Sequence, residues 1–462
     1  MHTPPEVVLL RKAWLGSKCL TLYRSILQDP CCQAFLHVLD LACTEAIDAS
    51  DLLKAYHCLV ATLADEAENA PATPVGDTWQ DHLLNLILRN ENPFSRQAEF
   101  TALTLMGASL REAASHDLRC LQFLFQLDAS VVRQAVSRLV EEASHTELPV
   151  PYPPMVLPTW ENLRSQAGKT GRQDTTEIRD LFARSRDWGQ LLPRLAGWYA
   201  STGVGIYGQY QAFRWVRQGA QGELQGISTP DPIRLQELIG YQSERAQLIQ
   251  NTEQFLQGYP ANNVLLYGDR GTGKSSTVKA LLNEYGQRGL RLIEVSKHHL
   301  TDFPELFSML RNRRQKFILF VDDLSFEDNE VSYKDLKAIL EGGLEARPDN
   351  VLIYATSNRR HLVKERFADR QFTDDEVRKS DTLQEKLSLS DRFGITVTFP
   401  SPDQEGYLAI VEGLARQRGL SIHPDDLRQM ALQWELWHNG RSGRTARQFI
   451  DHLTGELAIK KK

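Results

Sequence analysis

The chain has 462 residues, of which 42% are hydrophobic and 24% are charged, and its formal net charge is -6 at pH 7. A chain of this length exceeds what one core accommodates, so we expect two or three globular domains. The mild negative charge excludes a protein whose whole surface coats nucleic acid, but it leaves room for a local basic patch.

The N-terminus and the cysteines both favour a cytoplasmic protein. Residues 1–6 (MHTPPE) give no basic start before an apolar run, so we read no secretory signal, and no segment approaches the roughly 20 apolar residues of a membrane span. All six cysteines lie in the first 120 residues without a C-x-x-C pair, the spacing typical of zinc and redox sites. We therefore expect reduced thiols that pack as small apolar side chains.

Residues 1–147 are predicted to form an all-helical N-terminal domain. In segments such as 32–42 and 118–125, apolar residues recur every three or four positions, which is the period of an amphipathic helix. We find no catalytic constellation in this region. Its expected role is to bind a client, either protein or nucleic acid, that the sequence does not identify.

Residues 148–230 are predicted to be a proline-containing linker followed by a transitional segment. The run LPVPYPP at 148–154 is typical of extended polyproline-like chain, and the polar residues 164–176 lack any periodicity. Between 197 and 215, glycines alternate with aromatic residues. Such rings either form a stacking surface for a base or a partner, or pack into a neighbouring domain, and we favour packing.

From residue 231 onward, strand-like and helix-like segments alternate, which indicates a parallel sheet with crossover helices. The apolar run 263–267 is followed at once by GDRGTGKS (268–275) and then by a helix-forming segment, which is the Walker A or P-loop pattern in its structural context. Its glycines let backbone N–H groups face phosphates at the positive end of a helix. Lys274 is expected to reach the β- and γ-phosphates of ATP, and Ser275 to offer its hydroxyl to Mg²⁺.

Two later strands end in polar residues that suit the same site. The run 316–321 ends at Asp322 and Asp323; we expect Asp322 to bind Mg²⁺ through water and Asp323 to polarise the attacking water. The run 351–357 ends at Asn358, whose amide can orient that water without adding charge. A lone asparagine there is usually a turn residue, but its position after the other two elements favours the functional interpretation.

These motifs together resemble the AAA+ ATPase module, and residues from about 235 to 449 resemble an uncharacterised bacterial family of AAA+ ATP-binding proteins. The specific marks are NNVLLYGDRGTGK at 262–274, FVDDLSF at 320–326 and ATSNRR at 355–360. The resemblance implies an α/β P-loop core over 231–400, built as a parallel sheet with flanking helices. It also implies a small helical lid with a C-terminal tail over 401–462, and it makes Asn358 the sensor 1 residue.

The same resemblance assigns further site residues. Ile239 and Gly240, in the segment LIGY at 238–241, would contact adenine. Arg392, in LSDRFG at 389–394, would be an arginine finger that reaches the γ-phosphate of a neighbouring subunit in a nucleotide-dependent ring or partial ring. Arg444 is favoured over Arg447 as sensor 2. The expected catalytic residues are Lys274, Asp323, Asn358, Arg392 and Arg444, and the expected ATP contacts are Ile239, Gly240, Gly268, Asp269, Arg270, Gly271, Thr272, Gly273, Lys274, Ser275 and Ser276.

One departure from the AAA+ pattern bears on activity. Most members carry Glu after the metal-binding Asp, whereas this chain has Asp323, which is one methylene shorter. Hydrolysis is then either slow or assisted by Glu327. The sequence therefore favours an ATPase coupled to conformational change or assembly on a client, with an ATP-gated loader or adaptor as the alternative. A small-molecule kinase or GTPase is a weaker third reading, because no N-K-x-D base reader is present.

Overall fold

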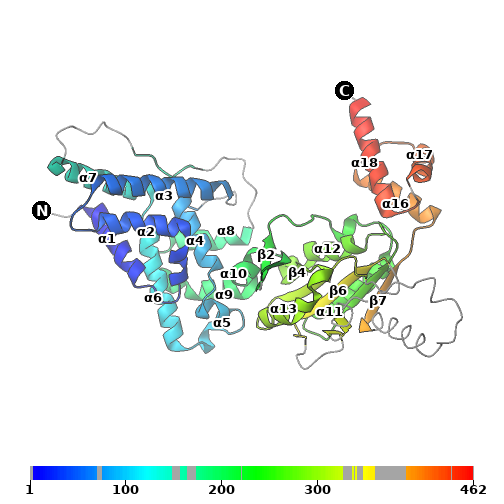
Figure 1. Ribbon diagram of the computed structural model, residues 1–462, viewed down its shortest axis with the longest axis horizontal. Coiled ribbons are helices and arrows are strands. Elements are labelled where there is room, and N and C mark those ends of the chain that lie inside the picture. Colours follow the sequence, from blue (N-terminus) through cyan, green and yellow to red (C-terminus); the bar gives the residue numbers. More distant parts are fainter. Residues whose placement is uncertain are drawn as a thin grey trace. The chain divides into compact units, whose positions relative to one another are not determined.

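The computed structural model describes residues 4–460, apart from 70–74, 148–156, 164–172, 220, 326–335, 338, 341–346, 359–391 and 439. The chain divides into two compact units, Met1–Gln209 and Tyr210–Lys462 (Figure 1). Among the residues so described, no helix has both the length and the apolar character needed to cross a membrane.

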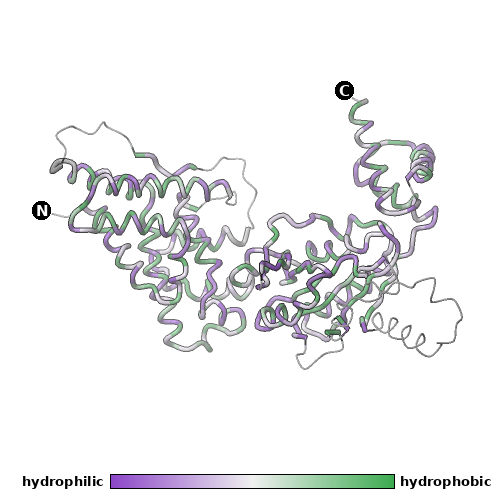
Figure 2. Tube along the Cα trace, viewed as in Figure 1, coloured by the Kyte–Doolittle hydropathy of each residue, from purple (hydrophilic) through white to green (hydrophobic). Residues whose placement is uncertain are grey.

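The first unit is all-helical in its described part, which confirms the fold predicted for the N-terminal region (Figure 1). Hydrophobic and hydrophilic residues alternate along these helices (Figure 2), and their apolar faces share one core that includes Trp79, Trp160 and Trp188. The helices are α1 (Pro5–Lys18), α2 (Pro30–Ala42), α3 (Ala49–Asn69), α4 (Thr78–Arg89), α5 (Pro93–Ala98), α6 (Ala108–Phe125), α7 (Ala129–Glu147), α8 (Gln173–Arg184), α9 (Leu192–Thr202) and α10 (Gly205–Gln209), with short 3₁₀ helices at Arg24–Gln28, Leu103–Leu105 and Trp188–Leu191.

The first unit extends well beyond the boundary expected near residue 150. Within the segment predicted as linker and transition, Trp160 and Tyr199 are fully buried in the helical core. The indole of Trp160 donates to Asp77 Oδ2 at 3.1 Å, and the Tyr199 hydroxyl donates to the carbonyl of Ile87 at 2.6 Å. The unit reaches Gln209 because these rings complete its core. The glycine-rich local sequence gives no helical pattern from which this packing could be predicted. Residues 148–156 lie outside the described part.

The second unit contains a seven-stranded sheet in the order β2-β1-β4-β5-β6-β3-β7. All neighbouring strands are parallel except the β1–β2 hairpin. Strands β5 and β6 are buried along almost their whole length, and β3 is buried over its first three residues, as expected for a parallel sheet covered on both faces. The strands are β1 (Ala212–Gln218), β2 (Gln221–Ile227), β3 (Val264–Gly268), β4 (Leu290–Glu294), β5 (Lys316–Val321), β6 (Val351–Ser357) and β7 (Ile395–Phe399).

The hairpin formed by β1 and β2 was not anticipated, because its residues fall in the predicted transitional segment. Its inner face is anchored by Trp215, whose indole donates to the buried carboxylate of Asp302 at 2.8 Å. Gly222 on the facing strand gives that ring its space, since a Cβ there would lie 1.8 Å from a ring carbon. The hairpin thus widens the sheet at its β4 edge.

Helices cover the sheet and form a separate lid. Helices α11 and α12 pack on one face through Leu248, Phe255, Val278 and Leu281, while the lid has its own core around Tyr407, Ala431 and Phe449. The helices are α11 (Gln242–Leu256), α12 (Lys274–Tyr285) and α13 (Phe303–Leu310), followed in the lid by α16 (Gln404–Gln417), α17 (Pro424–Trp437) and α18 (Gly443–Lys460); 3₁₀ helices occupy Leu235–Glu237, Gly286–Arg288 and Lys297–Asp302.

Candidate nucleotide-binding site

The P-loop joins β3 to α12 and lies where the carboxyl ends of β3, β5 and β6 meet. Its first glycine, Gly268, has φ of 143°, and a Cβ there would lie 1.9 Å from the carbonyl oxygen of Phe399, so a side chain is excluded. The hydroxyl of Thr272 donates to the carbonyl of Asp269 at 2.9 Å and closes the loop on itself. Gly273, with φ of 94°, leads directly into α12. The positive helix end therefore opens onto the pocket.

Lys274 connects the P-loop backbone with the residue that follows β6. Its ammonium group donates to the carbonyls of Gly268 and Asp269 at 2.8 and 2.7 Å and to Asn358 Oδ1 at 3.2 Å. Burial lowers the pKa of Lys274, while the nearby carboxylates, among them Asp322, act in the opposite direction. The strand-end amide thus contacts the P-loop lysine directly.

The two acids after β5 contact different residues. Asp322 Oδ1 accepts from the Ser275 hydroxyl at 2.6 Å and also from the Thr356 hydroxyl, so the two predicted Mg²⁺ ligands touch each other. Hydroxyl and carboxylate oxygens are the donors that Mg²⁺ prefers, and the residues present therefore fit that ion. Asp323 accepts from Asn358 Nδ2 at 2.6 Å and has φ of 52° in the left-handed region, which Asp tolerates better than most residues.

A cavity of about 600 Å³ is lined by these polar groups and by apolar side chains. This volume lies within the range of pockets that hold small ligands. The predicted adenine contact Ile239 is one of the apolar lining residues, together with Tyr241, Phe399, Ile410 and Leu414. Ile410 and Leu414 come from lid helix α16, where their spacing of four places them on one face.

Sequence reasoning missed three of these apolar residues: Phe399, Ile410 and Leu414. Tyr241 belongs to the segment LIGY at 238–241 that resembles an adenine contact. It has φ of 53°, its hydroxyl donates to the carbonyl of Pro400 at 2.5 Å, and its ring lies 5.2 Å from that of Phe399. The contacts of Ile410 and Leu414 depend on how the lid folds back over the core, which no local pattern specifies.

The lid contributes two arginines to the cavity. Arg444 and Arg447 both line it. The backbone N–H of Arg444 also donates to the carbonyl of Gly271 at 3.1 Å, which joins the first turn of α18 to the P-loop. The positive charge of Arg444 contributes to the lowered pKa of Lys274, although burial of the lysine is the larger cause. The preference for Arg444 as sensor 2 stays a prediction.

Most predicted ATP contacts line the same cavity: Ile239, Arg270, Gly271, Thr272, Gly273, Lys274, Ser275 and Ser276. Gly268 and Asp269 instead contact Lys274, because their carbonyls accept hydrogen bonds from its ammonium group. Neither Gly240 nor Arg392 is among the lining residues, and Arg392 lies three positions before the start of β7. Its assignment as a finger for a neighbouring subunit stays a prediction. Glu327 falls outside the described residues.

Residues 208–457 match the family model described as "Protein of unknown function (DUF815)", which is more than half of the chain. The chain belongs to this family. Together with the sheet, the P-loop and the lid described above, the match confirms the sequence-based interpretation of this DUF815 protein as a member of an uncharacterised AAA+ group.

The DUF815 chain also has similarity to better-known proteins over shorter stretches. It is 28% identical over 172 residues to a proteasome-activating nucleotidase of Methanoregula boonei, covering 33% of this chain and 34% of that one. It is 36% identical over 73 residues to a replication factor C large subunit of Staphylothermus marinus, covering 16% of each. The chain therefore spans about a third or less of these curated relatives. Among solved structures, the RuvB Holliday junction branch migration motor of Thermotoga maritima is 18% identical, covers 50% of this chain and 67% of RuvB, and has a TM-score of 0.35.

Proposed function

We propose that the second unit binds ATP with Mg²⁺ and hydrolyses it, and that the cycle drives conformational change or assembly on a client. The observation that carries this proposal is the mixed lining of the cavity. Lys274, the Ser275–Asp322 pair and the Asp323–Asn358 pair line it together with the apolar side chains of Ile239, Tyr241 and Ile410. A nucleoside triphosphate has the matching distribution of charge and flat apolar surface.

Each polar group has a distinct proposed task. The ammonium of Lys274 and the N–H groups at the start of α12 bind the β- and γ-phosphates. Ser275 and Asp322 hold Mg²⁺, which when bound neutralises charge that develops on the transferring phosphoryl group. Asp323 accepts a proton from the attacking water, and Asn358 orients both that water and the Asp323 carboxylate.

The lid is the proposed connection between nucleotide binding and a change in conformation. Arg444 reaches the phosphates from α18, while Ile410 and Leu414 contact the base from α16, so a bound nucleotide holds the lid against the core at two points. Loss of the γ-phosphate removes the partner of Arg444 and so weakens one of these two attachments of the lid to the core. The backbone bond between Arg444 and Gly271 makes the P-loop itself part of this connection.

We further propose that Arg392 acts in trans in a nucleotide-dependent homo-oligomer. An arginine suits this task because its fixed charge and forked donors stabilise the spread charge of the transferring phosphoryl group. Subunits with Arg392→Ala keep an intact P-loop, and subunits with Lys274→Ala keep an intact finger. Mixing the two should restore part of the wild-type ATPase rate. No restoration, with oligomers still present by mass measurement, would contradict the trans assignment.

A second candidate function, an ATP-gated loader or adaptor with little hydrolysis, is favoured by one observation. Asp323 is shorter than the usual Glu, and its carboxylate is already engaged by Asn358 at 2.6 Å. Both features reduce its reach toward a water molecule. Such a protein would use ATP binding alone to switch its affinity for a client.

Steady-state ATP hydrolysis by the full chain separates the two functions. The ATPase proposal expects wild-type turnover well above that of Lys274→Ala, and a large loss in Asp323→Asn with ATP binding retained. The matched control is Asn312→Ala, an exposed asparagine of the same unit that does not line the cavity. Wild-type turnover equal to the Lys274→Ala background, with ATP still bound, would leave the adaptor function.

A further inference from the structure

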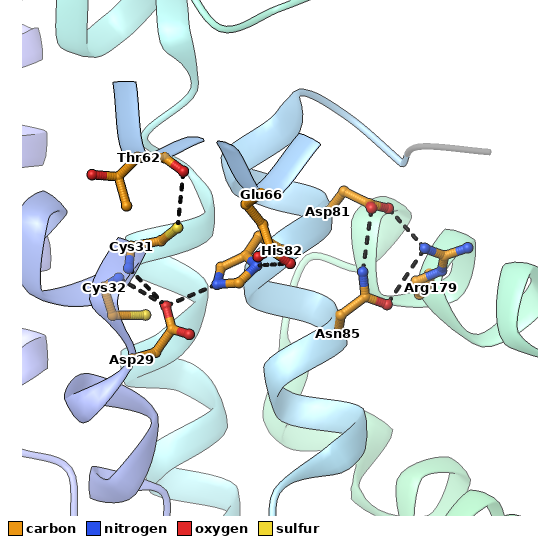
Figure 3. Close-up of polar contacts among 9 residues, drawn as sticks. All are labelled: Asp29, Cys31, Cys32, Thr62, Glu66, Asp81, His82, Asn85 and Arg179. Atoms are coloured by element: carbon orange, nitrogen blue, oxygen red, sulfur yellow. Dashed lines mark hydrogen bonds and ion pairs between the residues drawn. The ribbon is translucent and has the colours of Figure 1, made fainter. Parts of the chain in front are cut away.

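A second polar cluster lies in the first unit, where α2, α3 and α4 meet (Figure 3). The imidazole of His82, on α4, lies between two carboxylates: its Nε2 is 2.8 Å from Asp29 Oδ1, and its Nδ1 is 3.3 Å from Glu66 Oε1. Cys31, in the first turn of α2, completes the group. One donor atom each from Asp29, Cys31 and His82 lies within 4.8 Å of the other two.

The cluster is largely shielded from water. The side chain of His82 is 7% exposed, that of Asp29 is 20% exposed, and Cys31 is buried. Glu66, at 41%, is the member that reaches solvent. All four residues belong to the first unit, so the proposed ATP chemistry of the second unit makes no use of them.

We propose that Asp29, Cys31 and His82 bind one zinc ion, and that Glu66 orients His82 from its other ring nitrogen. A thiolate, an imidazole and a carboxylate form the mixed sulfur, nitrogen and oxygen donor set that suits Zn²⁺, and three protein ligands leave a fourth position for water. Histidine ligands of metals almost always donate their second N–H to a carboxylate or carbonyl, which is the contact that Glu66 makes.

The observed geometry is close to what one ion requires. In a tetrahedral zinc site, bonds of about 2.1 Å to nitrogen or oxygen and about 2.3 Å to sulfur place two donors roughly 3.4–3.6 Å apart. Asp29 Oδ1 and His82 Nε2 lie 2.8 Å apart as a hydrogen-bonded pair and would separate by about half an ångström, while the sulfur of Cys31 lies within 4.8 Å of both. Asp29 is already oriented, because its Oδ1 accepts from the backbone N–H groups of Cys31 and Cys32 at 2.9 and 3.1 Å, and a carboxylate has about four acceptor positions.

The competing description is a buried ion pair in which a proton takes the place of the metal. Burial lowers the pKa of His82, but its hydrogen bonds to Asp29, Cys31 and Glu66 raise it to about 11, so the metal-free cluster holds an imidazolium. In the metal-free cluster the Cys31 thiol donates to the carbonyl of Thr62 at 3.7 Å (Figure 3), whereas in the zinc site its thiolate would bind the ion. Zinc binding would displace protons from His82 and Cys31.

The proposed ion would connect helices that are distant in sequence. Asp29 and Cys31 fix the start of α2, and His82 belongs to α4, with Glu66 of α3 held by the imidazole. Because an ion that binds only the folded state stabilises that state, zinc removal should lower the melting temperature of the first unit. This stabilisation is independent of nucleotide.

Zinc content of the full chain, purified after growth with added zinc and measured by mass spectrometry, tests the proposal. We expect one zinc per chain in wild type and loss of bound zinc in Cys31→Ser, with affinity reduced roughly 10- to 100-fold in Glu66→Gln. Cys32→Ser is the matched control, since Cys32 is equally buried and adjacent but lies outside the cluster. Asp322→Ala should keep its zinc, which excludes zinc held at the proposed Mg²⁺ site.

X-ray absorption at the zinc edge of wild-type protein keeps the test decisive even where a variant fails to fold. One sulfur and otherwise nitrogen or oxygen neighbours are expected. Wild-type protein without bound zinc, a first shell with no sulfur or with two or more, or equal zinc loss in Cys31→Ser and Cys32→Ser would each overturn the proposal and leave the buried ion pair.

Discussion

Asn358 offers the sharpest test of how the polar groups of the cavity work. Its amide joins the P-loop to the acid pair: Oδ1 accepts from Lys274 Nζ at 3.2 Å, and Nδ2 donates to Asp323 Oδ1 at 2.6 Å. Asn358→Ala removes both contacts without changing the charge of the site. Asp323 then loses the group that fixes its carboxylate, and Lys274 keeps its two carbonyl partners.

The expected loss follows from the shorter contact. A hydrogen bond to a charged group contributes about 1.5–3 kcal/mol, and about 1.4 kcal/mol corresponds to a factor of ten in rate. If the Asp323 contact persists through phosphoryl transfer, kcat should fall roughly 10- to 150-fold. ATP affinity should change much less, because the phosphate-binding loop and Lys274 remain in place.

The assay is steady-state phosphate release over a range of ATP concentrations, beside a direct binding titration. Asn312→Ala should behave as wild type. A kcat for Asn358→Ala within twofold of wild type would refute the sensor assignment. So would a loss confined to ATP binding, since the amide would then serve the nucleotide and not the water-activating acid.

Three further predictions concern the metal, the base and the hairpin. Asp322→Asn should abolish the Mg²⁺ dependence of hydrolysis, seen as rates that no longer rise with added Mg²⁺; an unchanged Mg²⁺ titration would contradict this. Ile239→Asp places a charge against the adenine and should weaken ATP binding with little effect on melting temperature. Unaltered affinity would show that the adenine does not bind beside Ile239. Gly222→Ala should lower the free energy of unfolding by about 1–3 kcal/mol, because the added Cβ meets the Trp215 ring. Gly455→Ala, which has open space around it, should be neutral or slightly stabilising. Equal shifts in melting temperature for the two variants would contradict this packing.

The parts of the site that could be predicted are those whose signals are contiguous in sequence. The P-loop carries its strand, its glycines and its helix in one run, and Asp322 and Asn358 each follow an apolar strand directly. Because the carboxyl ends of parallel strands meet at one edge of the sheet, three separate local patterns predict residues of the same site. That geometry explains why Lys274 and Asn358, 84 positions apart, are in contact.

The parts that could not be predicted depend on contacts between distant segments. The strand at 212–218 pairs with β4 some 80 residues later, and its aromatic residues were assigned to a transitional segment because that partner is distant in sequence. Trp160 and Tyr199 complete a helical core most of whose other members precede residue 148. The cluster of Asp29, Cys31 and His82 is assembled from two helices, and for that reason it lacks the close cysteine spacing by which zinc sites are recognised.

The central claim is that the cavity between the sheet edge and the lid binds ATP through Lys274. Calorimetric titration of the full chain with ATP and Mg²⁺ tests it most directly, with Lys274→Ala and Asn312→Ala measured alongside. We expect one ATP per wild-type and Asn312→Ala chain, and an affinity at least tenfold weaker in Lys274→Ala, given the charge-assisted bonds that its ammonium makes. Equal affinities in wild type and Lys274→Ala, or no binding in either, would contradict the account.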